Sequence, residues 1–80
     1  MDNGRNYIAV VAHYSPDGKL TPRSIEWFDG RVYKVNKVFD VRPMASLKTR
    51  GFGIRYDVLI GRSRVYLFYE DSHWWVERME

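Results

Sequence analysis

The sequence contains no cysteine, and this absence excludes several kinds of site. Without thiols, the chain has no disulfide, no thiolate zinc site and no cysteine nucleophile. Long apolar runs are also missing, since the longest, at positions 7–12, falls far short of the ~20 residues that span a membrane. The first residues, MDNGRN, form no apolar signal region. We therefore expect a soluble, cytoplasmic protein that does not enter a membrane.

Motifs for catalysis and cofactor binding are absent as well. The two histidines, His13 and His73, are far apart and have no acidic neighbours at metal-ligand spacing. No serine lies in a Gly-x-Ser-x-Gly context. The Gly51-Phe52-Gly53 fragment precedes a strand pattern, whereas a phosphate-binding loop precedes a helix. The sequence therefore predicts a nonenzymatic protein with no metal and no cofactor.

Strand-forming residues are abundant, and aromatic residues alone make up 16% of the chain. The clearest local pattern lies at positions 24–41. Ile25 and Trp27 alternate with polar residues before Asp29-Gly30, and the alternation resumes at Tyr33. An Asp-Gly pair suits a two-residue type I′ turn, because both central positions of that turn need a positive φ. This stretch predicts a β-hairpin.

The same alternation, bounded by turn residues, predicts strands along the rest of the chain. They cover 7–14, about 23 to the Asp-Gly turn, 33–41, 54–60, 65–69 and 74–79. Pro22 is expected to delay the second strand until about Arg23, and Pro43 is expected to end the third. The alternation breaks at Asn36-Lys37, which predicts a β-bulge. No segment has the periodicity of a long helix, although 44–48 could form one helical turn.

Strands joined mostly by tight turns predict an all-β fold of a single small domain at 1–80, with 1–5 disordered. We expect a five- to six-stranded antiparallel meander that closes into a small SH3-like or OB-like barrel. A flat, half-open sheet is the alternative. Trp74 and Trp75 must point to opposite sides of their strand, so one ring is expected in the core and the other outside or at an edge. The predicted core comprises Ile25, Trp27, Tyr33, Val35, Tyr56, Val58, Leu67 and Val76.

One connection, at 43–53, is long and basic. From Arg42 to Arg55 the sequence contains no Asp or Glu, while the whole chain has a net charge of +3. A basic loop of this kind is suited to contact with phosphate groups. We therefore predict a nucleic-acid-binding module. The predicted binding residues are Arg42, Lys48, Arg50 and Arg55 for phosphate, with Phe52 as a stacking ring or as a plug over the barrel mouth.

An adaptor module for protein–protein interaction is the alternative, because Trp, Tyr and Arg dominate interface hot spots. The long loop and the exposed tryptophan would then form the docking patch. Exchanging Lys48 and Arg50 for glutamate is expected to leave the fold intact and to remove any affinity for nucleic acid. The oligomeric state does not follow from the sequence.

The pattern from position 22 to position 79 resembles a group of small uncharacterised bacterial proteins of about 80 residues, common in Firmicutes and without an established activity. The matching stretches are Pro22, Ser24-Ile25, Trp27, 29–31, 37–42, 45–48, Gly51, 53–56, 66–68 and 75–78. A looser pattern, with Trp27, Gly30-Arg31, Tyr33, Val35 and a terminal Trp74 or Trp75 with Arg78, is similar to small domains associated with error-prone DNA polymerases. That similarity implies a link to DNA repair, and thus a DNA-repair accessory module as a form of the predicted function.

Overall fold

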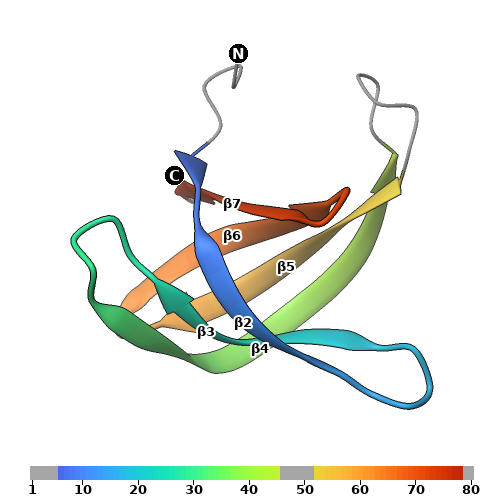
Figure 1. The fold of residues 1–80 in the computed structure, drawn as a ribbon, viewed down its shortest axis with the longest axis horizontal. Helices are drawn as coiled ribbons and strands as arrows, with labels where there is room; N and C mark the ends of the chain where they lie inside the picture. Colours follow the sequence, from blue (N-terminus) through green and yellow to red (C-terminus); the bar gives the residue numbers. More distant parts are fainter. Residues whose placement is uncertain (1–5, 46–51, 79–80) are drawn as a thin grey trace.

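The computed structural model describes residues 6–45 and 52–78, and in these residues the chain forms strands and turns without a helix (Figure 1). The strands are β1 (Asn6–Tyr7), β2 (Ala9–Tyr14), β3 (Leu20–Glu26), β4 (Val32–Ala45), β5 (Phe52–Ile60), β6 (Ser63–Glu70) and β7 (His73–Arg78). They pair in the order β1-β7-β6-β5-β4-β3-β2, and each of these pairs is antiparallel. The sheet curls into a half-barrel. The prediction of an all-β antiparallel fold is therefore confirmed.

The core lies on the inner side of this curled sheet. Period-two alternation places the apolar residues of β5, β6 and β7 on one face, and β3 contributes Ile25 to the same cluster. Directly opposed residues share a face, as in the row Tyr56, Leu67 and Val76. The buried cluster comprises Ile25, Tyr56, Val58, Ile60, Val65, Leu67 and Val76.

Tyr56 also ties the two halves of the sheet together. Its hydroxyl group donates a hydrogen bond to the carbonyl oxygen of Leu20 on β3. Burial raises the pKa of the Tyr56 phenol to about 12, with a smaller contribution from Tyr69. The phenol is therefore a neutral donor at physiological pH.

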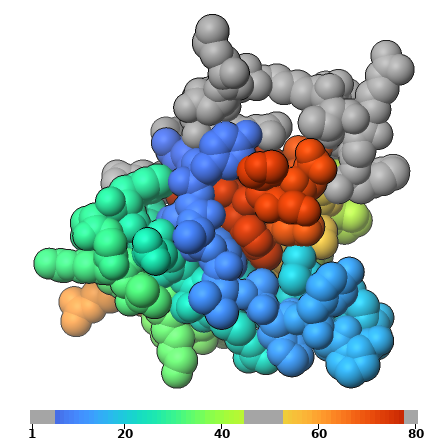
Figure 2. Space-filling view, in the orientation of Figure 1, coloured from blue at the N-terminus to red at the C-terminus, as the bar shows by residue number. Residues whose placement is uncertain are grey.

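The strand predicted at 7–14 is interrupted at Ile8, so the described residues contain seven strands where five or six were expected. Tyr7 pairs with Trp75 in β7, whereas Ala9 pairs with Glu26 in β3. Between them, the Ile8 N–H donates to the carbonyl oxygen of Trp74 at 3.0 Å. The N-terminal segment thus contacts both β7 and β3, and Figure 2 shows its blue atoms beside the red atoms of β7.

Both proline-based boundaries were wrong. β3 begins at Leu20 and β4 continues to Ala45, so each strand runs through its proline. At Pro22 the pairing with β2 is irregular: Val11 is opposite Ser24 and Ala12 is opposite Pro22. A bulge of this kind tolerates a residue without an N–H donor. The helical turn expected at 44–48 is also wrong at Met44 and Ala45, because both residues belong to β4. Residues 46–48 lie outside the described residues.

The bulge predicted at Asn36-Lys37 is confirmed, and a second one follows it. Val35 pairs with Ile60 and Lys37 with Leu59, which leaves Asn36 as the extra residue. Phe39 is extra in the same way between Val38 and Asp40. Two bulges within four residues bend β4 strongly and account for the curl of the sheet.

The predicted hairpin forms, but its turn is not type I′. Gly30 has a φ of 85°, whereas Asp29 is not among the described residues with positive φ. The Trp27 N–H donates to the Arg31 carbonyl oxygen at 2.7 Å, which makes a three-residue loop. Such loops combine an ordinary turn with a single left-handed residue, and glycine suits that place. The Asp29 carboxylate instead accepts a hydrogen bond from the Arg31 N–H at 3.0 Å.

Five of the predicted core residues are fully buried, but Trp27, Tyr33 and Val35 only pack against the edge of the core. β3 and β4 pair only near the hairpin turn, which leaves this corner of the sheet thinly covered. The two tryptophans do lie on opposite faces. Trp74 is half-buried against the core, and Trp75 stacks on Phe68 on the other face, with ring centroids 5.3 Å apart. Trp75 is only 7% exposed, so the prediction of an exposed tryptophan in a docking patch is wrong.

The turn between β6 and β7 offers a test of backbone strain. Asp71 and Ser72 have φ values of 52° and 64°, a left-handed conformation that L-residues adopt at a cost. Replacing Ser72 by glycine is expected to raise the free energy of unfolding by about 0.5–1 kcal/mol. Ser63→Gly is the control, because Ser63 begins β6 and has no positive φ, so this change should destabilise the protein. Urea unfolding midpoints measure the stability of both variants. A midpoint of the Ser72→Gly variant below that of the parent would contradict backbone strain at Ser72.

Candidate nucleic-acid interface

The outer face of the sheet, opposite the core, brings two of the predicted phosphate-binding residues together. The prediction of a basic loop from Arg42 to Arg55 was wrong at both ends, because β4 continues to Ala45 and β5 begins at Phe52. Arg42 on β4 lies directly opposite Arg55 on β5, so both side chains are on the same face. In the core-forming row beside them, Val41 is opposite Tyr56. We use the name outer face for the polar and aromatic side chains of β4, β5 and β6 that lie on this side and are not buried. They are Lys37, Phe39, Asp40, Arg42, Arg55, Asp57, Arg64 and Tyr66.

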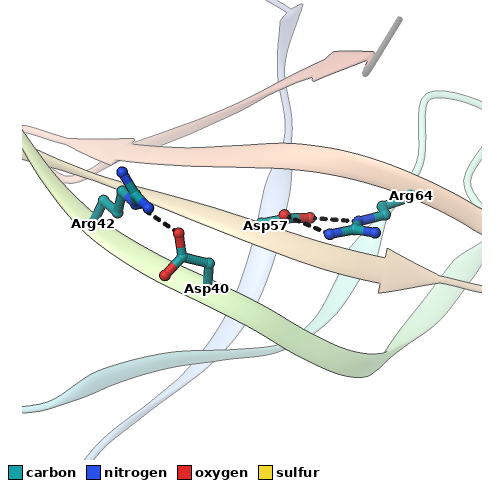
Figure 3. A network of polar contacts seen from close by, with 4 residues as sticks. All are labelled: Asp40, Arg42, Asp57 and Arg64. Carbon is teal, nitrogen blue, oxygen red and sulfur yellow. Dashed lines mark hydrogen bonds and ion pairs between the residues drawn. The ribbon is translucent and has the colours of Figure 1, made fainter.

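Acidic residues also lie on the outer face, although the stretch from 42 to 55 has none. Asp40 pairs directly with Asp57, one row away from the two arginines. The Arg42 Nε donates to an Asp40 carboxylate oxygen at 2.7 Å. Arg64 binds both carboxylate oxygens of Asp57, at 3.0 and 2.9 Å (Figure 3). The positive charge expected from the sequence is therefore partly balanced by two aspartates.

The Asp57–Arg64 ion pair predicts a pH dependence of stability. The two hydrogen bonds from Arg64 hold the pKa of the Asp57 carboxyl below its ordinary value, against a smaller opposing effect of desolvation. A carboxyl with a lowered pKa in the folded state stabilises the fold above its unfolded-state pKa of about 3.9, and this contribution disappears as the pH falls through the folded-state value.

Asp57→Asn and Arg64→Gln are therefore expected to reduce the loss of stability between pH 5 and pH 2. Unfolding midpoints in urea across that range measure the effect. The double variant should behave like either single variant, because each change alone removes the pair. Additive effects of the two changes would show that the pair does not act as a unit.

Aromatic rings lie between the cations of the outer face. The Arg55 guanidinium lies 4.8 Å from the centre of the Tyr66 ring. Arg64 and Lys37 both lie over the ring of Phe39, at 4.0 and 5.0 Å. At these distances the negative face of the ring attracts the cation. The outer face thus presents alternating planar groups and charges, which can bind flat or anionic ligands.

The remaining predicted residues are only partly placed. Lys48 and Arg50 lie outside the described residues. Phe52 begins β5 opposite Ala45, but its side chain is also outside the described part, so the choice between a stacking ring and a plug stays open.

Sequence reasoning missed Lys37, Phe39, Arg64 and Tyr66. Their position next to Arg42 and Arg55 depends on the register of β4, β5 and β6, and the bulges at Asn36 and Phe39 set part of it. The first bulge had a signal in the sequence, namely the broken alternation. The second also had a signal, the adjacent apolar residues Val38 and Phe39, but only one bulge was predicted from the broken alternation.

Within residues 6–45 and 52–78, no group of three His, Cys, Asp or Glu side chains is placed to hold a metal ion. Over the same residues, the chain has no helix of the length and apolarity needed to cross a membrane.

The fold and the outer face together define a small all-β domain with a mixed arginine, aspartate and aromatic surface. Comparisons of this chain with protein-family models, curated proteins and solved structures found no match.

Proposed function

We propose that this protein is a nonenzymatic, cytoplasmic module that binds nucleic acid through the outer face of β4, β5 and β6. The observation that carries the proposal is the direct opposition of Arg42 and Arg55, with the Tyr66 ring beside Arg55. Two cations in one row can contact neighbouring phosphates, and an adjacent ring can stack on an unpaired base.

The ion pairs on this face do not oppose the proposal. Asp40 and Arg42 are both substantially exposed, with 44% and 67% of their side-chain surfaces accessible to solvent. Exposed ion pairs contribute little to stability, so Arg42 can exchange the carboxylate for a phosphate at small cost. Arg64 is held more firmly, because two hydrogen bonds attach it to Asp57. Arg42 and Arg55 are therefore the first contacts we assign.

Docking to a protein is the second candidate, and the presence of Asp40 and Asp57 favours it. A surface with both signs of charge and with aromatic rings is typical of protein interfaces. Salt separates the two functions. Nucleic-acid affinity falls steeply as salt rises, whereas a site built on apolar and stacked contacts changes little.

We also propose that the half-barrel closes into a small barrel. Support comes from the N-terminal segment, which pairs with β7 through β1 and with β3 through β2. The similarity of the sequence to small domains associated with error-prone DNA polymerases would place the module in DNA repair. That assignment rests on the resemblance alone.

Exchanging Arg42 and Arg55 together for glutamate tests the binding site. Each phosphate contact on a single strand contributes about 0.7 to the slope of log affinity against log salt, so the double variant should flatten the slope by about 1.4. Lys19→Glu with Arg23→Glu is the matched control, since it changes the charge equally at exposed positions away from the outer face. Fluorescence anisotropy of a labelled single strand, at several salt concentrations, measures the affinity and the salt slope of both double variants.

If both double variants lose affinity equally, binding follows net charge and the outer face is not the site. If the parent shows no salt-sensitive binding to a single strand or a duplex, the nucleic-acid function is wrong and the protein-docking function replaces it.

A further inference from the structure

A cavity of about 320 Å³ lies at the corner of the fold, between the hairpin of β3 and β4 and the turn that joins β5 to β6. Trp27 and Tyr33 line it from the hairpin side, and Ile60 and Val65 form its apolar part. Its size is at the lower end of the range for small-molecule sites. None of the outer-face residues lines this cavity, so it is a separate feature of the molecule.

The polar groups of the cavity favour an anion. Arg62 on the turn between β5 and β6 and Ser63 at the start of β6 are exposed residues that line the cavity, and no carboxylate is among its lining residues. Arg62 makes no ion pair within the described part of the chain, unlike Arg31, Arg42 and Arg64. A guanidinium without an acidic partner is well suited to bind phosphate or carboxylate oxygens.

The two aromatic residues add a preference for a flat ligand. Trp27 and Tyr33 are half-buried and pack against the edge of the core, so part of each ring remains accessible from the cavity. Rings of this kind stack readily with a heterocyclic base. An aromatic wall beside a cation without an ion pair in the described residues therefore matches a ligand that joins a planar ring to an anionic group.

We propose that this cavity binds one nucleotide unit, with the base against Trp27 and Tyr33 and the phosphate at Arg62. The unit can come from a free nucleotide or from an unpaired position in a single strand. For a free nucleotide the inference is independent of the outer face. For a position in a nucleic-acid strand, the inference rests on the proposed function. It adds a preference for single-stranded over duplex nucleic acid, because a paired base cannot enter the cavity.

An NMR titration of the ¹⁵N-labelled protein tests the inference with four probes: adenosine monophosphate, inorganic phosphate, a ten-nucleotide single strand and the matching duplex. We expect the monophosphate and the single strand to shift the Trp27 indole N–H and the amides of Gly61 and Arg62 in a saturable way. Phosphate alone and the duplex should shift the Trp27 indole little. The Arg62→Gln change should lower the affinity for adenosine monophosphate about tenfold, as expected for a lost charge-assisted contact.

Lys34→Gln is the control, since Lys34 is an exposed neighbour of Tyr33 that does not line the cavity, and this variant should bind as the parent does. If neither the monophosphate nor the strand shifts the Trp27 indole at millimolar concentration, the inference is wrong. The same holds if inorganic phosphate reproduces the monophosphate shifts, because the base then plays no part.

The experiment also separates this inference from the proposed function. The Arg42→Glu, Arg55→Glu variant should keep the monophosphate shifts at Trp27 and Gly61. If that variant loses its affinity for the single strand while the Arg62→Gln variant keeps the parent's affinity, the outer face is the site and the cavity does not bind the single strand. If the monophosphate binds at the cavity and no strand binds anywhere, the proposed function fails and the cavity site remains.

Discussion

Replacing Leu67 by alanine is expected to lower the free energy of unfolding by about 2–5 kcal/mol. Leu67 has no exposed surface and lies at the centre of the core, directly between Tyr56 on β5 and Val76 on β7. Truncation would leave a cavity that these paired strands cannot easily close. Small domains have a total stability near the lower end of about 5–15 kcal/mol, so this loss would be a large part of the whole.

Urea unfolding followed by tryptophan fluorescence measures the effect, with Val41→Ala as the matched control. Val41 is also opposite Tyr56, but 51% of it is exposed, so its truncation should cost much less. Leu67→Met keeps the volume and should cost less than about 1.5 kcal/mol, which provides a folded variant if the alanine form does not fold. Equal midpoints for Leu67→Ala and Val41→Ala would show that the core is misassigned.

Replacing Gly53 by alanine is expected to lower the free energy of unfolding by about 1–3 kcal/mol. A Cβ atom at this position would lie 2.9 Å from the backbone carbonyl oxygen of Tyr69 and 3.3 Å from the Cβ of Glu70. The nearer neighbour is backbone, so relief of the overlap requires β5 and β6 to move apart. Gly53 has no positive φ, and the expected loss therefore comes from space rather than from backbone strain.

Hydrogen exchange distinguishes this local effect from a general loss of stability. In Gly53→Ala the amides of Ile54 and Tyr69, which are paired next to the overlap, should exchange faster than those at the other end of the β5–β6 pair. A variant as stable as the parent, with unchanged exchange at both residues, would contradict the close approach of β5 and β6 at Gly53.

Much of the fold follows from alternation along the sequence, because the side-chain period of a strand is a local property. The pattern predicted the hairpin, the bulge at Asn36 and five fully buried core residues. The errors arose where the tertiary environment overrides a local rule. Pro22 and Pro43 usually mark strand ends, yet an irregular pairing tolerates Pro22, and Pro43 lies in a long strand that pairs with β5.

The candidate site was less predictable for the same physical reason. Counting charges along the chain identified Arg42 and Arg55 in a stretch without acids, but it could not show that Asp40 and Asp57 lie in the next row of the outer face. Cross-strand neighbours depend on register, and a shift of one residue moves every side chain to the other face. The cavity beside Trp27 had no sequence signal, because its two sides come from turns that are distant in the chain.

The central claim, that the outer face binds nucleic acid, is tested most directly by mapping a single strand onto the sheet by NMR. The ¹⁵N-labelled protein is titrated with a ten-nucleotide strand at low and at moderate salt. Besides the shifts expected at the cavity of Trp27, we expect shifts at Arg42, Arg55 and Tyr66 at low salt, with little change at the core residues Val58 and Leu67. The shifts at Arg42, Arg55 and Tyr66 should fade at moderate salt. Shifts that persist unchanged at moderate salt, or that leave Arg42 and Arg55 unaffected, would contradict the claim.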